Sequence, residues 1–153
     1  MPNGRQIELD FVRHPGASAI VPLHADETVT LIRQYRYSAD GWIIEIPAGK
    51  LDHGETPVVC AARELTEEVG LKAGKLESLG FIYVTPGFCD EKIHLFIATE
   101  LTEVKQALEE DEMLEVKRVP LREAYRMAVD GDITDAKSVT ALLRVAAKRG
   151  VTT

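Results

Sequence analysis

The stretch that decides the fold is GKLDHGETPVVCAARELTEEVGL, residues 49–71. It carries four glutamates, Glu55, Glu64, Glu67 and Glu68, within fourteen residues. An acidic cluster of this density is usually the solvated face of a surface helix. The same residues could also hold a divalent cation, because such ions prefer carboxylate and carbonyl oxygens. The position of the acids relative to the neighbouring apolar residues bears on this choice.

The sequence predicts a helix over Pro57–Val69. Thr56 is a good N-cap, proline suits the first helical turn, and Gly70 suits a left-handed stop. On a wheel of about 100° per residue with Glu64 at zero, one apolar stripe spans roughly 60° to 160°. The stripe consists of Val58, Ala61, Ala62, Leu65 and Val69. We therefore expect this helix to pack on the core.

The carboxylates lie on one side of the expected helix. Glu64 and Glu68 fall at about 0° and 40°, along the border of the stripe, and Glu67 at about 300°. Like charges four residues apart repel, and more strongly when they are partly desolvated, which favours a bound cation. Alternatively, Arg63 pairs with Glu67 at i,i+4 on an ordinary solvated face. The helical periodicity leaves both interpretations open.

The residues before the helix add further oxygen ligands. A loop bounded by glycines, residues 49–54, follows an apparent strand end at residues 45–49. A strand end, a tight loop and a helix face can present backbone carbonyls and carboxylates at one place. These are the ligand types that hard divalent cations use.

The complete pattern resembles the Nudix box. Gly49 is followed after five residues by Glu55, and after seven more by Arg63-Glu64-Leu65-Thr66-Glu67-Glu68-Val69-Gly70-Leu71. Every defined position of the motif is matched, which favours the metal over the solvated face. The resemblance implies a Nudix hydrolase with an α/β fold, a Nudix-type α/β/α sandwich with a mixed β-sheet. Such an enzyme cleaves a nucleoside diphosphate linked to another group X.

The resemblance also implies a metal site. Its ligands would be Glu64, Glu68 and the backbone carbonyl of Ala48, with Glu67 close by. The implied cofactor is Mg²⁺, with Mn²⁺ as the alternative ion. The ion would neutralise the diphosphate and orient its phosphates, and a second or third ion would lower the pKa of the attacking water.

Further roles follow from the same motif. Arg63 and Glu55 resemble the family's orienting pair, which holds the loop to the helix. Gly49 and Gly70 resemble its backbone-turn positions.

Other segments resemble the ADP-ribose pyrophosphatase branch of the family. They are residues 16–22, 32–37 and 45–49, and Pro86, fifteen residues after Leu71. The resemblance implies a small-molecule nucleotide substrate, ADP-ribose, hydrolysed to AMP and ribose 5-phosphate. The alternatives are another Nudix substrate (a GDP-sugar, a dinucleotide or an oxidised nucleotide) or a non-catalytic nucleotide-binding regulator. The regulator would usually lack an acid of the box, and none is missing.

The branch commonly takes its general base from an acidic loop, here residues 109–112. By resemblance Glu110 is the base and Glu112 a supporting metal or water ligand, although four consecutive acids leave the register ambiguous. Arg36 is a candidate for binding a phosphate or the terminal ribose, because a guanidinium forms paired hydrogen bonds with phosphate oxygens. Phe88 is a candidate for shaping the substrate pocket. A surface arginine and a packing aromatic are the ordinary alternatives for these two.

The rest of the chain predicts alternating strands and helices in one domain, residues 1–153. The expected helices after the motif are Leu121–Val129 and Ser138–Lys148. A hairpin through Asp26-Glu27 is expected to join the second and third strands. The expected strands are Ile7–Arg13, Ala17–Leu23, Thr28–Tyr37, Trp42–Ile46, Leu76–Val84, Lys92–Thr99 and Glu115–Val119.

Composition limits the partners. The net charge of −7 disfavours binding to nucleic acid, and no apolar run approaches membrane-spanning length. The first residues contain no apolar signal core, and Cys60 and Cys89 lack the spacing of a metal knuckle. We expect a cytoplasmic protein with free thiols. The resemblance further implies a homodimer.

Overall fold

The body of the protein contains two β-sheets. The computed structural model describes residues 1–108 and 113–152. The larger sheet has the order β4-β1-β6-β5, formed by Ala48–Lys50, Ala17–Pro22, Lys92–Glu103 and Leu71–Tyr83. The smaller sheet has the order β3-β2-β7, formed by Gly41–Glu45, Thr28–Arg36 and Leu114–Pro120. Strands β1 and β6 are parallel and the other pairs are antiparallel, so the larger sheet is mixed, as predicted.

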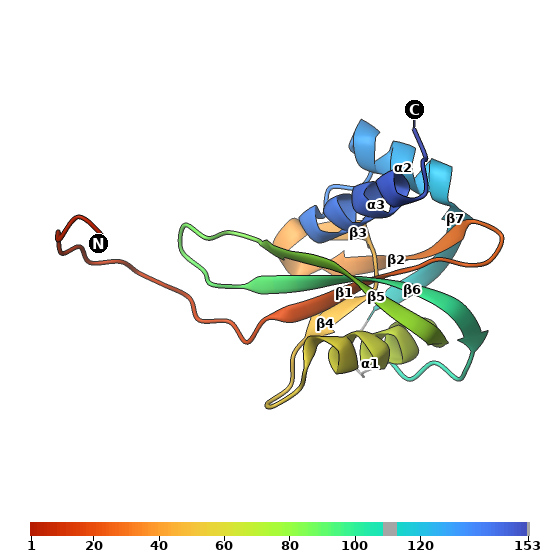
Figure 1. Ribbon diagram of the computed structural model, residues 1–153, viewed down its shortest axis with the longest axis horizontal. Helices are drawn as coiled ribbons and strands as arrows, with labels where there is room; N and C mark the ends of the chain where they lie inside the picture. Colours follow the sequence, from red (N-terminus) through yellow and green to blue (C-terminus); the bar gives the residue numbers. More distant parts are fainter. Residues whose placement is uncertain (109–112, 153) are drawn as a thin grey trace.

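Helices cover both faces of the larger sheet (Figure 1). They are α1 (Pro57–Val69) on one face and α3 (Ala136–Lys148) on the other, while α2 (Leu121–Asp130) packs against α3 and against strands of the smaller sheet. Side chains alternate along β1, so Ala19 and Val21 join the core under α2 and α3, whereas Ile20 packs with Leu65 of α1. This arrangement is the predicted α/β/α sandwich. Among the described residues, none of the helices has the length and apolar character needed to cross a membrane.

Most of the predicted elements are confirmed, with shifted ends. The three helices are present, and six of the expected strands correspond to β1, β2, β3, β5, β6 and β7. Strand β5 begins at Leu71, directly after the helix, rather than at Leu76. Strand β4 and a 3₁₀ turn at Tyr37–Ala39 were not predicted. Strand β4 has only three residues and includes Gly49, so neither its length nor its propensity identifies it.

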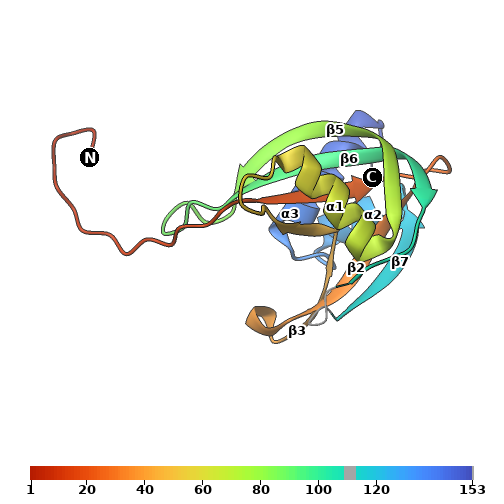
Figure 2. The ribbon, with the colours of Figure 1, turned by 90° about the horizontal axis from the view of Figure 1, so that it is seen from below.

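The strand predicted at Ile7–Arg13 is wrong. Within it only Val12 forms an isolated bridge, to Cys89, and the segment runs away from the body of the protein (Figure 2). Its apolar residues Ile7, Leu9 and Phe11 are exposed in this chain. Apolar alternation marks a strand only where a neighbouring strand supplies hydrogen bonds, and this segment lies beside none of the described strands.

The predicted hairpin through Asp26-Glu27 is also wrong. Strands β1 and β2 belong to different sheets, and among the described residues their pairing is limited to an isolated bridge between Leu23, just past β1, and Val29. Each strand has other partners, because β1 lies between β4 and β6 and β2 lies between β3 and β7. The turn therefore carries the chain from one sheet to the other.

The ends of helix α1 lie where the sequence predicts. Thr56 occupies the N-cap with an extended backbone, although its side chain makes no capping hydrogen bond, and Pro57 is the first helical residue. Gly70 ends the helix in the left-handed region, at φ 63°, and its N–H bonds to the Thr66 carbonyl. A residue with a Cβ would be strained there.

The buried face of α1 differs from the predicted apolar stripe. Val58 is 46% exposed and Ala62 is also exposed, whereas the buried residues are Cys60, Ala61, Glu64, Leu65 and Glu68. The buried arc is rotated toward the acids, so Glu64 and Glu68 lie within it and not on its border. Hydrophobicity misplaces this arc because two of its members are carboxylates.

This rotation predicts unequal costs for two truncations in α1. Leu65→Ala should destabilise the protein by about 2–5 kcal/mol, since it removes buried methyl groups and leaves a cavity. Val58→Ala should change the free energy of unfolding by no more than about 0.5 kcal/mol. Urea unfolding of the two variants measures both values. Equal losses would instead support the stripe predicted from the sequence.

Candidate active site

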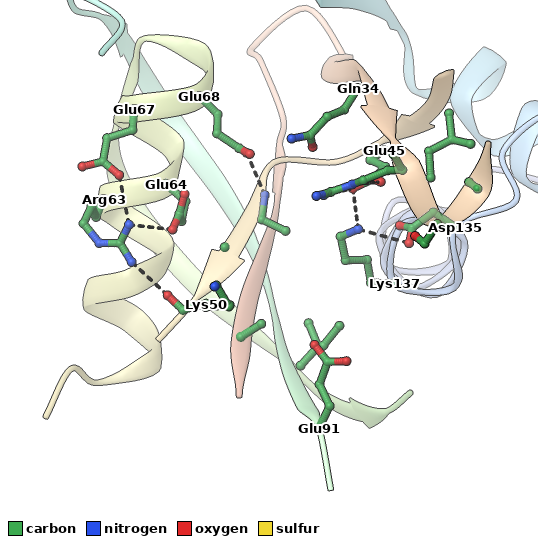
Figure 3. Close-up of a pocket in the computed structure, with 18 of the residues that line it drawn as sticks. Gln34, Glu45, Lys50, Arg63, Glu64, Glu67, Glu68, Glu91, Asp135 and Lys137 are labelled. Carbon is green, nitrogen blue, oxygen red and sulfur yellow. Dashed lines mark hydrogen bonds and ion pairs between the residues drawn. The ribbon is translucent and has the colours of Figure 1, made fainter. Parts of the chain in front are cut away.

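A cavity of about 700 Å³ lies between α1 with β4 on one side and the smaller sheet with the start of α3 on the other (Figure 3). The first wall carries Glu64, Glu67 and Glu68. The second wall is also polar; its residues include Gln34, Arg36, Glu45, Asp135 and Lys137. The cavity thus brings together residues separated by about a hundred positions in the sequence.

Arg63 holds two acids of the first wall, Glu64 and Glu67, in place. Its Nε and Nη2 atoms donate to Oε1 and Oε2 of Glu55 at 3.1 and 3.0 Å. Its Nη1 atom donates to Glu64 at 2.6 Å and to Glu67 at 2.9 Å, and Nη2 also reaches the Lys50 carbonyl at 3.0 Å. The bonds to Glu55 raise the pKa of Arg63, and they hold the pKa of Glu55 below its ordinary value. One guanidinium therefore connects the loop, the strand and the helix.

The absence of a side chain at Gly49 makes room for Glu64. A Cβ built on Gly49 would lie 1.8 Å from Oε1 of Glu64, far inside van der Waals contact. Gly49 lies in β4 and does not have the positive φ that would require glycine. The expectation that Gly49 is a backbone-turn position is therefore wrong. Glycine is needed here for close approach.

Glu68 is the most buried acid of the first wall, with 1% of its surface exposed. Its Oε2 atom accepts a hydrogen bond from the Ala48 N–H at 2.8 Å, which fixes the carboxylate beside β4. Glu64, at 7% exposure, lies one helical turn away. The side chain of Gln106 donates to the backbone carbonyl of Glu68.

The donor set of this wall suits a hard divalent cation. Two buried carboxylates and the backbone of Ala48 lie together at the edge of the cavity. Within residues 1–108 and 113–152, no group of three His, Cys, Asp or Glu residues is spaced to enclose a metal ion. Mg²⁺ commonly takes only one or two protein carboxylates and fills its shell with water and phosphate oxygens, so this set fits such an ion.

Cys60 lies behind the acids with its side chain fully buried. Its thiol contacts the carbonyls of Gly49 and Lys50 at 3.4 and 3.5 Å, and Nη2 of Arg63 lies 3.6 Å from the sulfur. Burial raises the pKa of this thiol to about 11, so it is protonated at neutral pH. A neutral thiol is a poor ligand for Mg²⁺ and acts here as packing.

Glu45 is the centre of the second wall. It accepts two parallel hydrogen bonds from Arg36, both at 2.8 Å, and one from the Lys137 ammonium at 2.6 Å. Burial raises the pKa of Glu45, but the two cations outweigh it and leave that pKa below its ordinary value. Lys137 also lies 3.1 Å from Asp135, which caps α3 by accepting from the Ser138 N–H.

The structure places several, but not all, of the predicted site residues around the cavity. It brings Ala48, Glu64, Glu67, Glu68 and Arg63 to one wall and Arg36 to the opposite wall. Glu55 lies behind Arg63. Glu110 and Glu112 lie outside the described residues.

Phe88 does not line the cavity, contrary to its predicted place in the pocket. Its side chain is 56% exposed in the loop between β5 and β6. The reason is backbone pairing, because the Phe88 carbonyl accepts from the Val12 N–H and holds this loop against the N-terminal segment.

Sequence reasoning missed the polar residues of the second wall. Gln34 lies in β2, and Asp135 and Lys137 lie at the start of α3, a hundred residues further along the chain. No local spacing connects these segments. An aspartate of N-cap type two residues before a lysine, Asp135 and Lys137, is the one available signal in the sequence, and it is weak.

Comparison with known proteins assigns the family. The NUDIX domain model matches residues 12–142, which is most of the chain. The chain belongs to the Nudix family.

Relatives of this Nudix protein carry several names. It is 40% identical over 144 residues to an ADP-ribose pyrophosphatase of Bacillus subtilis, covering 93% of this chain and 78% of that one. The same identity and coverage hold for a methanol dehydrogenase activator of Bacillus methanolicus. A GDP-mannose pyrophosphatase of Klebsiella pneumoniae is 34% identical over 142 residues, with 86% and 71% covered.

A solved structure agrees with the fold. The crystal structure of an ADP compounds hydrolase superposes on this Nudix protein with a TM-score of 0.76 and 28% identity. The match covers 89% of this chain and 76% of that one.

The contact between Gly49 and Glu64 predicts a coupled effect. Gly49→Ala should destabilise the protein by about 1–3 kcal/mol, because the new methyl group displaces the Glu64 carboxylate. In a Glu64→Ala background the same substitution should cost much less, which thermal unfolding of the four proteins measures. Gly87→Ala is the control, since its Cβ would meet nothing within 4 Å. Equal costs in both backgrounds would contradict the assignment.

Proposed function

We propose that this Nudix pyrophosphohydrolase cleaves the diphosphate of a nucleoside diphosphate sugar, ADP-ribose in particular, to AMP and ribose 5-phosphate. The observation that carries the proposal is the complete acidic motif on the wall of a polar cavity, in a chain 40% identical to an ADP-ribose pyrophosphatase. The cavity is large enough for a diphosphate and a sugar.

The first wall is the proposed site of a divalent cation, Mg²⁺ or alternatively Mn²⁺. Glu64, Glu68 and the Ala48 carbonyl would hold it. When bound, such an ion neutralises diphosphate charge and lowers the pKa of a bound water. Glu67 adds negative charge beside these ligands, held at 2.9 Å by Arg63.

In this proposal Arg63 and Glu55 do not react with the substrate; they hold a metal ligand in position. Their two parallel hydrogen bonds fix the guanidinium, which in turn fixes the Glu64 carboxylate at 2.6 Å. A ligand held before the substrate arrives loses little freedom during the reaction. On the opposite wall, Arg36 is the proposed contact to a phosphate or the terminal ribose. Two of its donors already bond to Glu45, which fixes the direction of its guanidinium.

Glu110 remains the proposed general base, with Glu112 as a supporting ligand. Both stand immediately before β7, which pairs with β2, the strand that carries Gln34 and Arg36. Leu114, at the start of β7, pairs with Gln34 in the wall of the cavity.

A homodimer and a cytoplasmic location are also proposals. The exposed apolar residues of the N-terminal segment, Ile7, Leu9 and Phe11, are suited to contact with a second subunit. Light scattering tests the dimer, and the mass of a single chain would refute it.

Two relatives support alternative functions. The name of the Klebsiella relative supports a GDP-sugar as substrate, and the name of the Bacillus methanolicus relative supports action on another protein. Neither alternative requires a change in the acidic wall.

A substrate panel tests the proposed function. The protein with Mg²⁺ is incubated with ADP-ribose, GDP-mannose, a dinucleotide and an oxidised nucleoside triphosphate, and AMP, GMP and inorganic phosphate are quantified. We expect the largest kcat/KM for ADP-ribose, with AMP as product. Preference for GDP-mannose would favour the GDP-sugar alternative, and no turnover of any compound would favour the regulator.

Two glutamine substitutions separate the proposed metal ligand from the proposed base. Glu68→Gln keeps an acceptor for the Ala48 N–H but lowers the ligand charge, so turnover should fall by at least about a hundredfold and apparent Mg²⁺ affinity should weaken. Glu110→Gln should lower kcat by about 10²- to 10⁴-fold with unchanged Mg²⁺ affinity. Metal titrations of the rate give both quantities. Wild-type turnover in either variant would remove that residue from its role.

A further inference from the structure

The second wall of the cavity contains an unsatisfied polar atom. Gln34 is only 6% exposed and lines the cavity, and its Oε1 atom has no hydrogen-bond partner within the described parts of the chain. Its carboxamide is directed into the gap between Glu68 and Glu45 (Figure 3). A buried acceptor without a donor is costly, so a ligand that supplies a donor here gains affinity.

The charges of the second wall compensate one another. Arg36 and Lys137 are bound to Glu45, and Lys137 also contacts Asp135, so two cations face two anions. Such a wall carries no net charge to attract an anion at a distance, although Arg36 can still donate to a phosphate or to the terminal ribose. It does offer hydrogen bonds, and a neutral group with several hydroxyls, such as a sugar, makes use of them.

The described residues provide no aromatic surface for stacking a base in this cavity. None of its described lining residues is aromatic. Nucleobases are commonly held by stacking on aromatic rings. The polar second wall therefore fits the sugar end of the substrate better than the base end.

We propose that Gln34 is a specificity-determining residue whose carboxamide oxygen accepts a hydrogen bond from a hydroxyl of the sugar attached to the diphosphate. The inference rests on the proposed function and names the part of the substrate that the cavity selects. The protein should then discriminate between substrates that carry this sugar hydroxyl and those that lack it.

The test couples a change in the protein to a change in the substrate. Gln34→Met keeps side-chain length and removes the acceptor. Each protein is assayed with ADP-ribose and with the pentyl ester of ADP, which has the same scissile bond and no sugar hydroxyls. We expect Gln34→Met to lower kcat/KM for ADP-ribose by about tenfold, the effect of one lost hydrogen bond, and to leave the pentyl ester unchanged.

Two controls define the effect. Arg33→Met alters the adjacent residue of β2, which pairs with Glu115 outside the cavity, and should change neither rate. Gln34→Met should lower kcat/KM for GDP-ribose by the same factor as for ADP-ribose, because Gln34 contacts the sugar and not the base. Thermal unfolding shows whether Gln34→Met is folded.

The unaltered protein provides a second measurement without any substitution, since it should cleave ADP-ribose with a higher kcat/KM than the pentyl ester.

The outcomes are distinct. An equal loss on ADP-ribose and the pentyl ester would overturn the proposal, since Gln34 would then bind something common to both, such as a metal-bound water. An unchanged rate on ADP-ribose in a folded variant, or no preference of the unaltered protein for the sugar, would overturn it as well. If the unaltered protein cleaved no nucleoside diphosphate compound, the proposed function would fail instead.

Discussion

The acidic wall depends on the guanidinium of Arg63. Without a cation among them, Glu55, Glu64 and Glu67 would repel one another across a small volume, and partial burial would increase that repulsion. Arg63 bonds to all three within 3.1 Å and to a carbonyl of β4. A lysine could not replace it, because an ammonium has no planar fork to engage both oxygens of Glu55. The helix can therefore turn carboxylates toward the core.

The two sheets give the cavity its two unlike walls. The wall on the larger sheet comes from residues close in sequence and is strongly acidic, whereas the wall on the smaller sheet is internally neutralised around Glu45. An anionic substrate would be repelled by the first wall in the absence of a cation. The asymmetry suits a molecule with an anionic centre and a neutral polar end.

The sequence predicted those features that depend on residues close together in the chain. Helix α1 was predicted with its correct ends because the proline at its start and the glycine at its end act on adjacent backbone. The resemblance located the acids of the first wall because the motif is contiguous. The rotation of the buried face of α1 could not be predicted, because the burial of Glu64 and Glu68 depends on tertiary contacts that include β4 and Arg63. Likewise, β1 and β2 belong to different sheets because each pairs with strands far along the chain. The residues of the turn between them do not indicate those partners.

The first turn of α3 binds tightly to the end of the smaller sheet. Lys137 bonds to Glu45, and the Ser138 hydroxyl accepts from the Ile46 N–H at 2.8 Å, so the last helix of the chain completes the cavity begun by residues 34–49. The Nudix motif alone is therefore not sufficient to form the whole cavity. Grafted into another scaffold, it would bring the acids but leave behind the half of the cavity that meets the rest of the substrate. Divergence in what such proteins act on can thus arise near the carboxyl end of the chain while the motif itself stays unaltered.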